Sequence, residues 1–194
     1  TVVPGIVTNP STGRIWLDRN LGATQVATSP TDVNSYGHLY QWGRGTDGHQ
    51  LRTNSGTTPT LSSSNTPGHD DFILAPNSPY DWRSPQNTNL WQGVSGTNNP
   101  CPSGYRLPTE AEWEAERKSW SNNNYTGAFA SPLKLPLAGA RNLSTGSINN
   151  EGSGGFYWSS TVNSTSSVNL FFSSSGGVSN NKRAFGFSVR CIKD

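Results

Sequence analysis

The chain has 194 residues, of which 31% are hydrophobic and 13% charged, with a formal net charge of +2. Its length suffices for one domain with a substantial core, so we expect residues 1–194 to form a single domain. No Lys/Arg cluster is present, which argues against nucleic-acid binding, because such binding uses clustered positive charge. No apolar run approaches the roughly 20 residues of a membrane span, so direct membrane insertion is not expected.

The hydrophobic residues are strongly aromatic: 7 Trp, 6 Tyr and 7 Phe accompany 21 Gly and 13 Pro. This composition predicts an aromatic core framed by loops. The sequence GRIWLD at 13–18 predicts a strand with Ile15 and Leu17 on one face and Trp16 on the other. Residues 35–44 predict a short helix that runs into a strand.

Residues 46–99 are rich in Gly, Ser, Thr, Asn and Pro. Such a long irregular stretch within a domain is usually functional or pinned to the core. We expect its hydrophobic residues to act as pins: Phe72, Ile73, Leu74, Trp82, Leu90 and Trp91. Asp70, Asp71 and Asp81 provide the oxygen ligands that calcium prefers, but they lack an EF-hand spacing. We therefore expect no cofactor, with a bound calcium ion as the alternative.

The clearest local signals lie in residues 101–120. Thr109 predicts a helix N-cap, and Glu112 completes a capping box. Trp113 and Trp120 fall on one stripe of this helix, which we expect to face the core. The glutamates of its first turns favour the positive end of the helix dipole, and paired catalytic carboxylates are the alternative interpretation.

Cys101 and Cys191 are the two cysteines of the chain, 90 positions apart. They are too few and too distant in sequence for a metal cluster, and we predict a disulfide between them. On the chain-entropy model, closing a loop of that size stabilises by about 4 to 5 kcal/mol. Two buried thiols in a reducing compartment are the alternative.

After the helix we expect strands at 133–137, in GGFYWSST at 154–161, in VNLFF at 168–172 and in AFGFSVRCIK at 184–193. The strand at 184–193 should pair with 168–172 across the turn SSSGGVS. Successive side chains of a strand point to opposite faces, so every second residue lies on the core side. The core residues are then Val168, Leu170, Phe172, Phe185, Phe187, Val189 and Cys191.

The same period turns Asn169 and Phe171 outward, beside the polar turn that follows them. Aromatic rings among small hydroxyl and amide side chains are typical of adaptable binding surfaces. Tyr157 and Phe185 belong either to this surface or to the core. The predicted ligand-binding residues are Tyr157, Asn163, Asn169, Phe171, Ser173, Ser175, Ser179, Asn180, Asn181 and Phe185.

Six motifs resemble, in order and spacing, those of the Fibrobacter-type major paralogous domain. They are WLDRNLGA at 16–23, YGHLYQWGR at 36–44, CPSGYRLPTEAEWE at 101–114, PLAGARN at 136–142, YWSS at 157–160 and GFSVRCIKD at 186–194. That family is similar in fold to C-type lectin-like domains and to the formylglycine-generating enzymes. The resemblance implies an α+β, C-type lectin-like fold, with two helices around small antiparallel sheets and extensive ordered loops.

The chain also resembles the variable proteins of diversity-generating retroelements, many of which vary the segment after a YWSS-like motif. Residues 159–181 use only residue types reachable from AAC-type codons through mutation of template adenines. The resemblance therefore implies a hypervariable binding segment. A serine-rich surface hairpin without diversification is the alternative.

We expect a non-enzymatic binding module, secreted or displayed on a cell surface or virion, that recognises a protein or glycan. No G-x-S-x-G motif, phosphate loop or metal signature occurs in the sequence. The similar formylglycine-generating enzymes need two cysteines near the C-terminus, where this chain has only Cys191. The E-P-N, Q-P-D and W-N-D signatures of calcium-dependent lectins are absent too. A purely structural paralogous domain is the remaining alternative.

Overall fold

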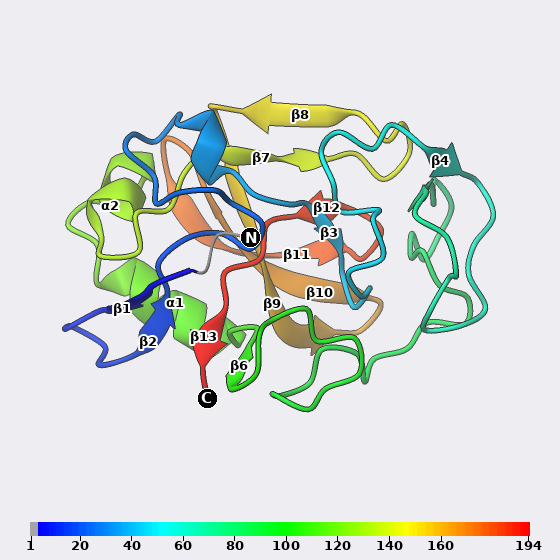
Figure 1. Cartoon of the computed structure of the whole chain (residues 1–194), viewed down its shortest axis with the longest axis horizontal. Coiled ribbons are helices and arrows are strands. Elements are labelled where there is room, and N and C mark those ends of the chain that lie inside the picture. Colours follow the sequence, from blue (N-terminus) through cyan, green and yellow to red (C-terminus); the bar gives the residue numbers. More distant parts are fainter. Residues whose placement is uncertain (1–3) are drawn as a thin grey trace.

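The computed structural model describes residues 4–194, which form an α+β fold that is mostly sheet, with two helices (Figure 1). The helices are α1 (Glu110–Lys118) and α2 (Tyr125–Ala130), and a 3₁₀ turn, η1, spans Val33–Ser35. The strands are β1 (Ile6–Thr8), β2 (Ile15–Leu17), β3 (Tyr40–Gln41), β4 (Thr57–Thr58), β5 (Phe72–Ile73), β6 (Tyr105–Arg106), β7 (Ala138–Arg141), β8 (Ile148–Glu151), β9 (Gly155–Asn163), β10 (Ser166–Phe172), β11 (Gly176–Lys182), β12 (Gly186–Phe187) and β13 (Ile192–Lys193).

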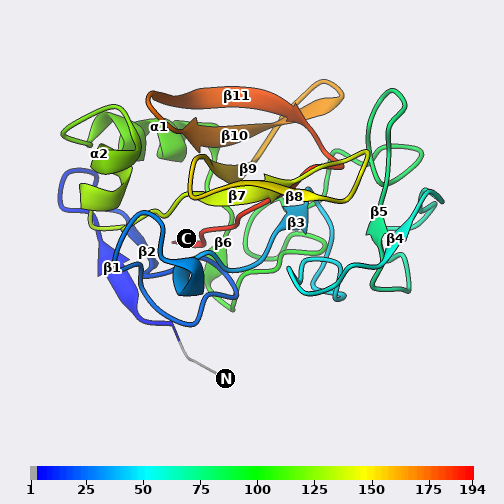
Figure 2. The same ribbon diagram turned by 90° about the horizontal axis from the view of Figure 1, so that it is seen from above.

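Two sheets organise the fold. A seven-stranded sheet has the order β11-β10-β9-β7-β12-β3, with β8 beside β7, and a four-stranded sheet has the order β1-β2-β13-β6. Their pairs are antiparallel except β7 with β9, and β4 and β5 form a separate parallel pair. The helices lie at one end of the molecule and β4 and β5 at the other (Figure 2). The prediction of an α+β fold with two helices is confirmed, but one sheet has seven strands and contains a parallel pair.

Helix α1 begins as the sequence predicts. The Thr109 hydroxyl accepts a hydrogen bond from Glu112 N at 3.3 Å, and the Glu112 carboxylate accepts one from Thr109 N at 2.8 Å. The helix lies against strands β9, β10 and β11. Trp113 is fully buried in a cluster with Trp16 and Tyr157. The capping box therefore fixes the start of a helix whose tryptophan enters the core, as expected.

The strand predicted at 133–137 is wrong, because β7 begins only at Ala138. Lys134 has a φ of 50°, which breaks an extended backbone. Leu135 N donates to Ala128 O and Leu137 N to Pro30 O, so this segment bonds to loops and a helix end rather than to a strand. Its leucines are nevertheless buried. Buried leucines at every second position therefore do not make this segment a strand, because no neighbouring strand pairs with it.

The predicted turn at 173–179 is also wrong in part. Residues 176–182 form β11, which pairs with β10, while β9 pairs with its other edge. Both edges of β10 are thus occupied, so the segment 184–193 cannot join it. That segment instead contributes β12 to one sheet and β13 to the other. Its predicted phase holds, because Phe187, Val189 and Cys191 share one buried cluster.

Cys101 and Cys191 form a disulfide, as predicted. Their Sγ atoms are 2.07 Å apart and their Cα atoms 5.8 Å apart. The bond joins the C-terminal segment to the loop that leads into β6 and α1. Since 90 positions separate the two cysteines, it closes a large loop of the unfolded chain.

The long region 46–99 is pinned by its aromatic residues, as expected. Phe72, Trp82 and Trp91 are fully buried, and Leu90 is 2% exposed. Trp82 Nε1 also donates a hydrogen bond of 2.7 Å to the carbonyl oxygen of Trp42. All four pins contribute apolar burial, and Trp82 and Trp91 also donate to a backbone carbonyl oxygen, which explains how a region so poor in regular structure stays ordered.

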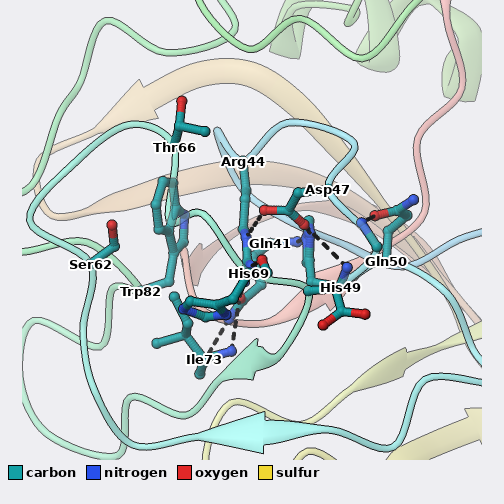
Figure 3. A network of polar contacts seen from close by, with 12 residues as sticks. Gln41, Arg44, Asp47, His49, Gln50, Ser62, Thr66, His69, Ile73 and Trp82 are labelled. Atoms are coloured by element: carbon teal, nitrogen blue, oxygen red, sulfur yellow. Dashed lines mark hydrogen bonds and ion pairs between the residues drawn. The ribbon is translucent and has the colours of Figure 1, made fainter.

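A buried polar network, not expected from the sequence, fixes the same region (Figure 3). Arg44 donates to Asp47 at 2.7 Å, to Gln41 at 3.0 Å and to the carbonyl oxygen of His69 at 2.9 Å. His49 Nδ1 contacts Asp47 at 2.6 Å, and His49 Nε2 accepts from Gln41 N at 3.1 Å. Because Nε2 accepts, His49 is neutral with its proton on Nδ1. The network ties loop segments to β3.

We predict that Trp113→Ala lowers the free energy of unfolding by roughly 3 to 5 kcal/mol, since it removes a buried indole and leaves a cavity. The lost hydrogen bond from Trp113 Nε1 to Trp158 O adds to this cost. Urea unfolding measures the change. Val33→Ala is the control, because Val33 is 70% exposed and should change stability by less than about 0.5 kcal/mol. A loss below about 1 kcal/mol for Trp113→Ala would contradict its burial.

We also predict a loss of stability in mild acid that depends on His49. Burial lowers the pKa of His49 to about 4, whereas its ordinary value is 6.5. Between these values the unfolded chain takes up a proton that the folded chain does not, so the free energy of unfolding falls by about 3 kcal/mol as pH drops. In His49→Asn this part of the pH dependence should disappear. An NMR titration of the His49 ring with a midpoint near 6.5 would refute the prediction.

Candidate functional site

The predicted binding residues are spread along the β9–β11 meander and do not form one patch. Asn163 and Asn180 are exposed and joined by a hydrogen bond of 3.0 Å near the β9–β10 turn. Ser173 and Ser175 lie at the opposite end, where Ser173 O accepts from Tyr125 N at the start of α2. Ser179 lies between the two ends on β11, whereas Asn181 lies beside Asn180, and both are partly buried. At about 3.3 Å per residue, the two ends are too far apart for one small ligand.

Tyr157 belongs to the core, which excludes it from the predicted surface. It is fully buried, and its ring stacks on Phe172 at 5.6 Å. Its hydroxyl donates to Pro136 O at 2.7 Å and accepts from Asn20 Nδ2 at 3.1 Å. Burial raises the pKa of this hydroxyl well above its ordinary value, so it stays protonated. The residue is a structural tie between β9 and two loops.

Asn169 is fully buried as well, which corrects the prediction that it points to solvent. Its Oδ1 accepts a hydrogen bond of 2.8 Å from Asn181 Nδ2. The chain that leaves β11 crosses this face of the sheet: Arg183 donates to Ser167 Oγ at 3.1 Å, and Phe187 packs on Trp158 at 4.4 Å. The sheet is therefore covered on both faces at this level, and a period of two no longer separates core from solvent.

A row of phenylalanines occupies the less covered end of the same face. Phe185 stacks on Phe187 at 5.5 Å between ring centroids, and Phe187 stacks on Phe156 at 5.3 Å. Phe171 lies opposite Phe156 in the β9–β10 register. Phe187 is buried, but Phe156, Phe171 and Phe185 keep part of their surface exposed. We call Phe156, Phe171, Phe185 and Phe187 the aromatic row.

Two glycines let the rings of this row lie close to the backbone. A Cβ on Gly177 would lie 3.1 Å from the Phe171 ring, and a Cβ on Gly154 would lie 2.8 Å from the Phe156 ring. Side chains at these positions would displace the rings. The row is thus held in place by the strands beneath it rather than by long side chains around it.

Phe156 is a member of the row that is not among the predicted binding residues. Phe156 precedes Tyr157, so the alternation within β9 turns it to the opposite face from this buried tyrosine. The alternation within GGFYWSST therefore carries a signal for Phe156 as well as for Tyr157. Core and binding surface were the two environments predicted for Phe185, and it combines them: it packs against the core cluster and remains partly exposed.

The three aspartates considered for calcium do not form a site. Within residues 4–194 no three His, Cys, Asp or Glu side chains gather closely enough to hold a metal ion. The Asp81 carboxylate accepts from Gln86 at 2.9 Å and lies 3.6 Å from the Arg183 guanidinium. It is buried with these partners, whereas Asp70 is exposed. Asp81 therefore serves as a structural acceptor.

Comparison of the chain with protein-family models, with curated proteins and with solved structures found no match. In the part of the chain that the structure describes, no helix is long and apolar enough to span a bilayer.

We predict that Asn169→Ala lowers the free energy of unfolding by about 1 to 3 kcal/mol, because a fully buried amide is removed and Asn181 Nδ2 loses its acceptor. Asn180→Ala should change it by less than about 0.5 kcal/mol, since Asn180 is exposed. Chemical denaturation of both variants provides the measurement. Equal effects of the two substitutions would place Asn169 at the surface after all.

Proposed function

We propose that this chain is a non-enzymatic binding module with a C-type lectin-like fold, which recognises a protein or glycan through the aromatic row and the polar side chains beside it. The observation that carries the proposal is the row itself: Phe156 and Phe171 on one sheet face, and Phe185 on the segment that follows β11, are partly exposed. Exposed rings offer contact area at low entropic cost. Ser179 and Asn181, on the neighbouring strand, add small hydrogen-bonding groups.

The fold assignment is supported by the motif resemblance together with the arrangement of elements. Two helices pack at one end of a sheet in which β9, β10 and β11 form a meander at one edge. The disulfide joins the C-terminal segment to the loop before β6 and α1. A disulfide is most often kept in an oxidising compartment, which supports secretion or display on a cell surface or virion.

Diversification of residues 159–181 is part of the proposal, and the structure limits where it would act. Ser159, Ser167 and Asn169 are buried and hydrogen-bonded, so substitutions there would cost stability. Asn163 and Asn180 are exposed. Sibling genes that differ mainly at exposed positions of this segment would support diversified binding, whereas siblings without such a bias would favour a purely structural domain.

The binding test uses two matched double variants. Phe171→Ser with Ser179→Arg removes a ring and adds charge on the proposed surface. Val33→Ser with Leu51→Arg makes the same kinds of change at 70% and 38% exposed positions elsewhere. A glycan array and a panel of purified surface proteins provide the ligands, and immobilised wild-type chain identifies those that bind.

We expect the first double variant to weaken binding at least about tenfold and the second to leave it unchanged, as for loss of a central aromatic contact. A chelator such as EDTA should have no effect, since recognition is proposed to need no metal. Unchanged binding by a folded Phe171→Ser, Ser179→Arg variant would move the site elsewhere.

A further inference from the structure

A hollow of about 270 Å³ shares no lining residue with the aromatic row. It is bordered by the segment before β4 and by the turn between β7 and β8, which lie side by side in Figure 1. A Cβ on Gly146 would come within 2.7 Å of Thr57 Cγ2, so turn and segment are in close contact. Ligand pockets for drug-sized molecules usually span about 300 to 1,000 Å³, so this one suits a small chemical group.

Arg141 forms the floor of this hollow. It is the last residue of β7 and is only 3% exposed. Its Nε donates to Gly146 O at 2.8 Å, its Nη1 donates to His49 O at 3.3 Å, and its guanidinium carbon lies 4.3 Å from the centroid of the Phe72 ring. An arginine has further N–H donors on Nη2. Within residues 4–194 no acceptor receives a hydrogen bond from Nη2.

The charge of Arg141 also lacks a partner. None of the ion pairs within the described residues includes it. Burial lowers the pKa of Arg141, and no carboxylate opposes this effect. Arg44 differs, because Asp47 lies 2.7 Å from it. An unpaired charge with so little exposure is costly, and a bound anion would offset that cost.

Arg190 shows how this protein otherwise accommodates an arginine without a carboxylate. It is 1% exposed, and its donors reach Asn20 Oδ1 and the carbonyl oxygens of Leu17 and Leu133. All three of its nitrogens therefore have protein acceptors. Arg141 differs from Arg190, because its Nη2 has no protein acceptor within residues 4–194 and the side chain borders a hollow.

The rim of the hollow is suited to an anion as well. Ser55, Thr57, Thr145 and Ser147 line it with exposed hydroxyl-bearing side chains. Arg52 adds a second positive charge, although Glu151 pairs with it at 2.8 Å. Arginine binds carboxylate, sulfate and phosphate groups through paired N–H donors, and hydroxyl groups donate to the remaining oxygens.

We propose that this hollow binds a compact oxyanion, with Arg141 Nη2 as the charged donor and the rim hydroxyls as supporting donors. The oxyanion is either a free inorganic ion or the charged group of a small molecule such as a sugar phosphate. The site is independent of the aromatic row, so it stands or falls separately from the proposed protein or glycan binding there.

The test is an NMR titration of the full chain with inorganic phosphate at constant ionic strength, followed through the backbone amides of Gly146, Ser147 and Thr57. We expect saturable shifts confined to the hollow. Ser147→Asp places a tethered carboxylate at the rim and should weaken phosphate binding at least about tenfold, whereas the isosteric Ser147→Asn should retain it. Since Ser147 is exposed, neither substitution endangers folding.

A parallel titration with glucose 6-phosphate distinguishes the two sources of the anion. Tighter binding than inorganic phosphate assigns the site to a phosphorylated or otherwise acidic small molecule, and equal binding assigns it to the free ion. Arg141→Gln should abolish the response to both probes. The proposal is overturned if wild-type chain shows no saturable shift at these amides, or if Ser147→Asp and Ser147→Asn respond equally to phosphate.

Discussion

The fold depends on indole N–H groups that bond to backbone carbonyl oxygens of distant segments. Trp42 donates to Ser159 O at 2.9 Å, Trp158 to Tyr40 O at 2.8 Å and Trp113 to Trp158 O at 3.0 Å. A chain with only 31% hydrophobic residues cannot build a large aliphatic core. Five of the seven tryptophans instead bury a large ring and donate to a backbone carbonyl oxygen: Trp42, Trp82, Trp91, Trp113 and Trp158. This double role lets short strands and long loops form one stable structure.

Buried arginines extend the same solution to the loops. Arg44 and Arg190 each bond to several carbonyl or amide oxygens, so one side chain replaces several ladder hydrogen bonds. Such networks are stable only when every donor is used, because an unpaired buried group is costly. Arg141 departs from this pattern at the edge of a hollow, and the aromatic row departs from the rule that rings are covered.

The candidate surface follows from how the last strands meet. Because β10 lies between β9 and β11, the segment after Lys182 must cross the sheet face, where it covers Asn169 with Phe187 and Arg183. The crossing segment runs from Arg183 past Phe185 to Phe187, and Phe156, Phe171 and Phe185 remain partly exposed beside it. Binding at these rings would use a rigid scaffold, since the strands are held by the core below.

Features that depend on neighbours along the chain could be predicted without a structure. The capping box at Thr109, the strands of GGFYWSST and VNLFF and the phase of Phe187 to Cys191 rest on local backbone chemistry and on the period of two. Isolation of the two cysteines was enough to predict their bond. Three-dimensional packing was needed to show that Asn169 and Tyr157 are buried, that 176–182 is a strand and that 133–137 is not. Those outcomes depend on which distant segment occupies a sheet edge or covers a sheet face, and a periodic pattern reports which residues share a face but not what lies against it.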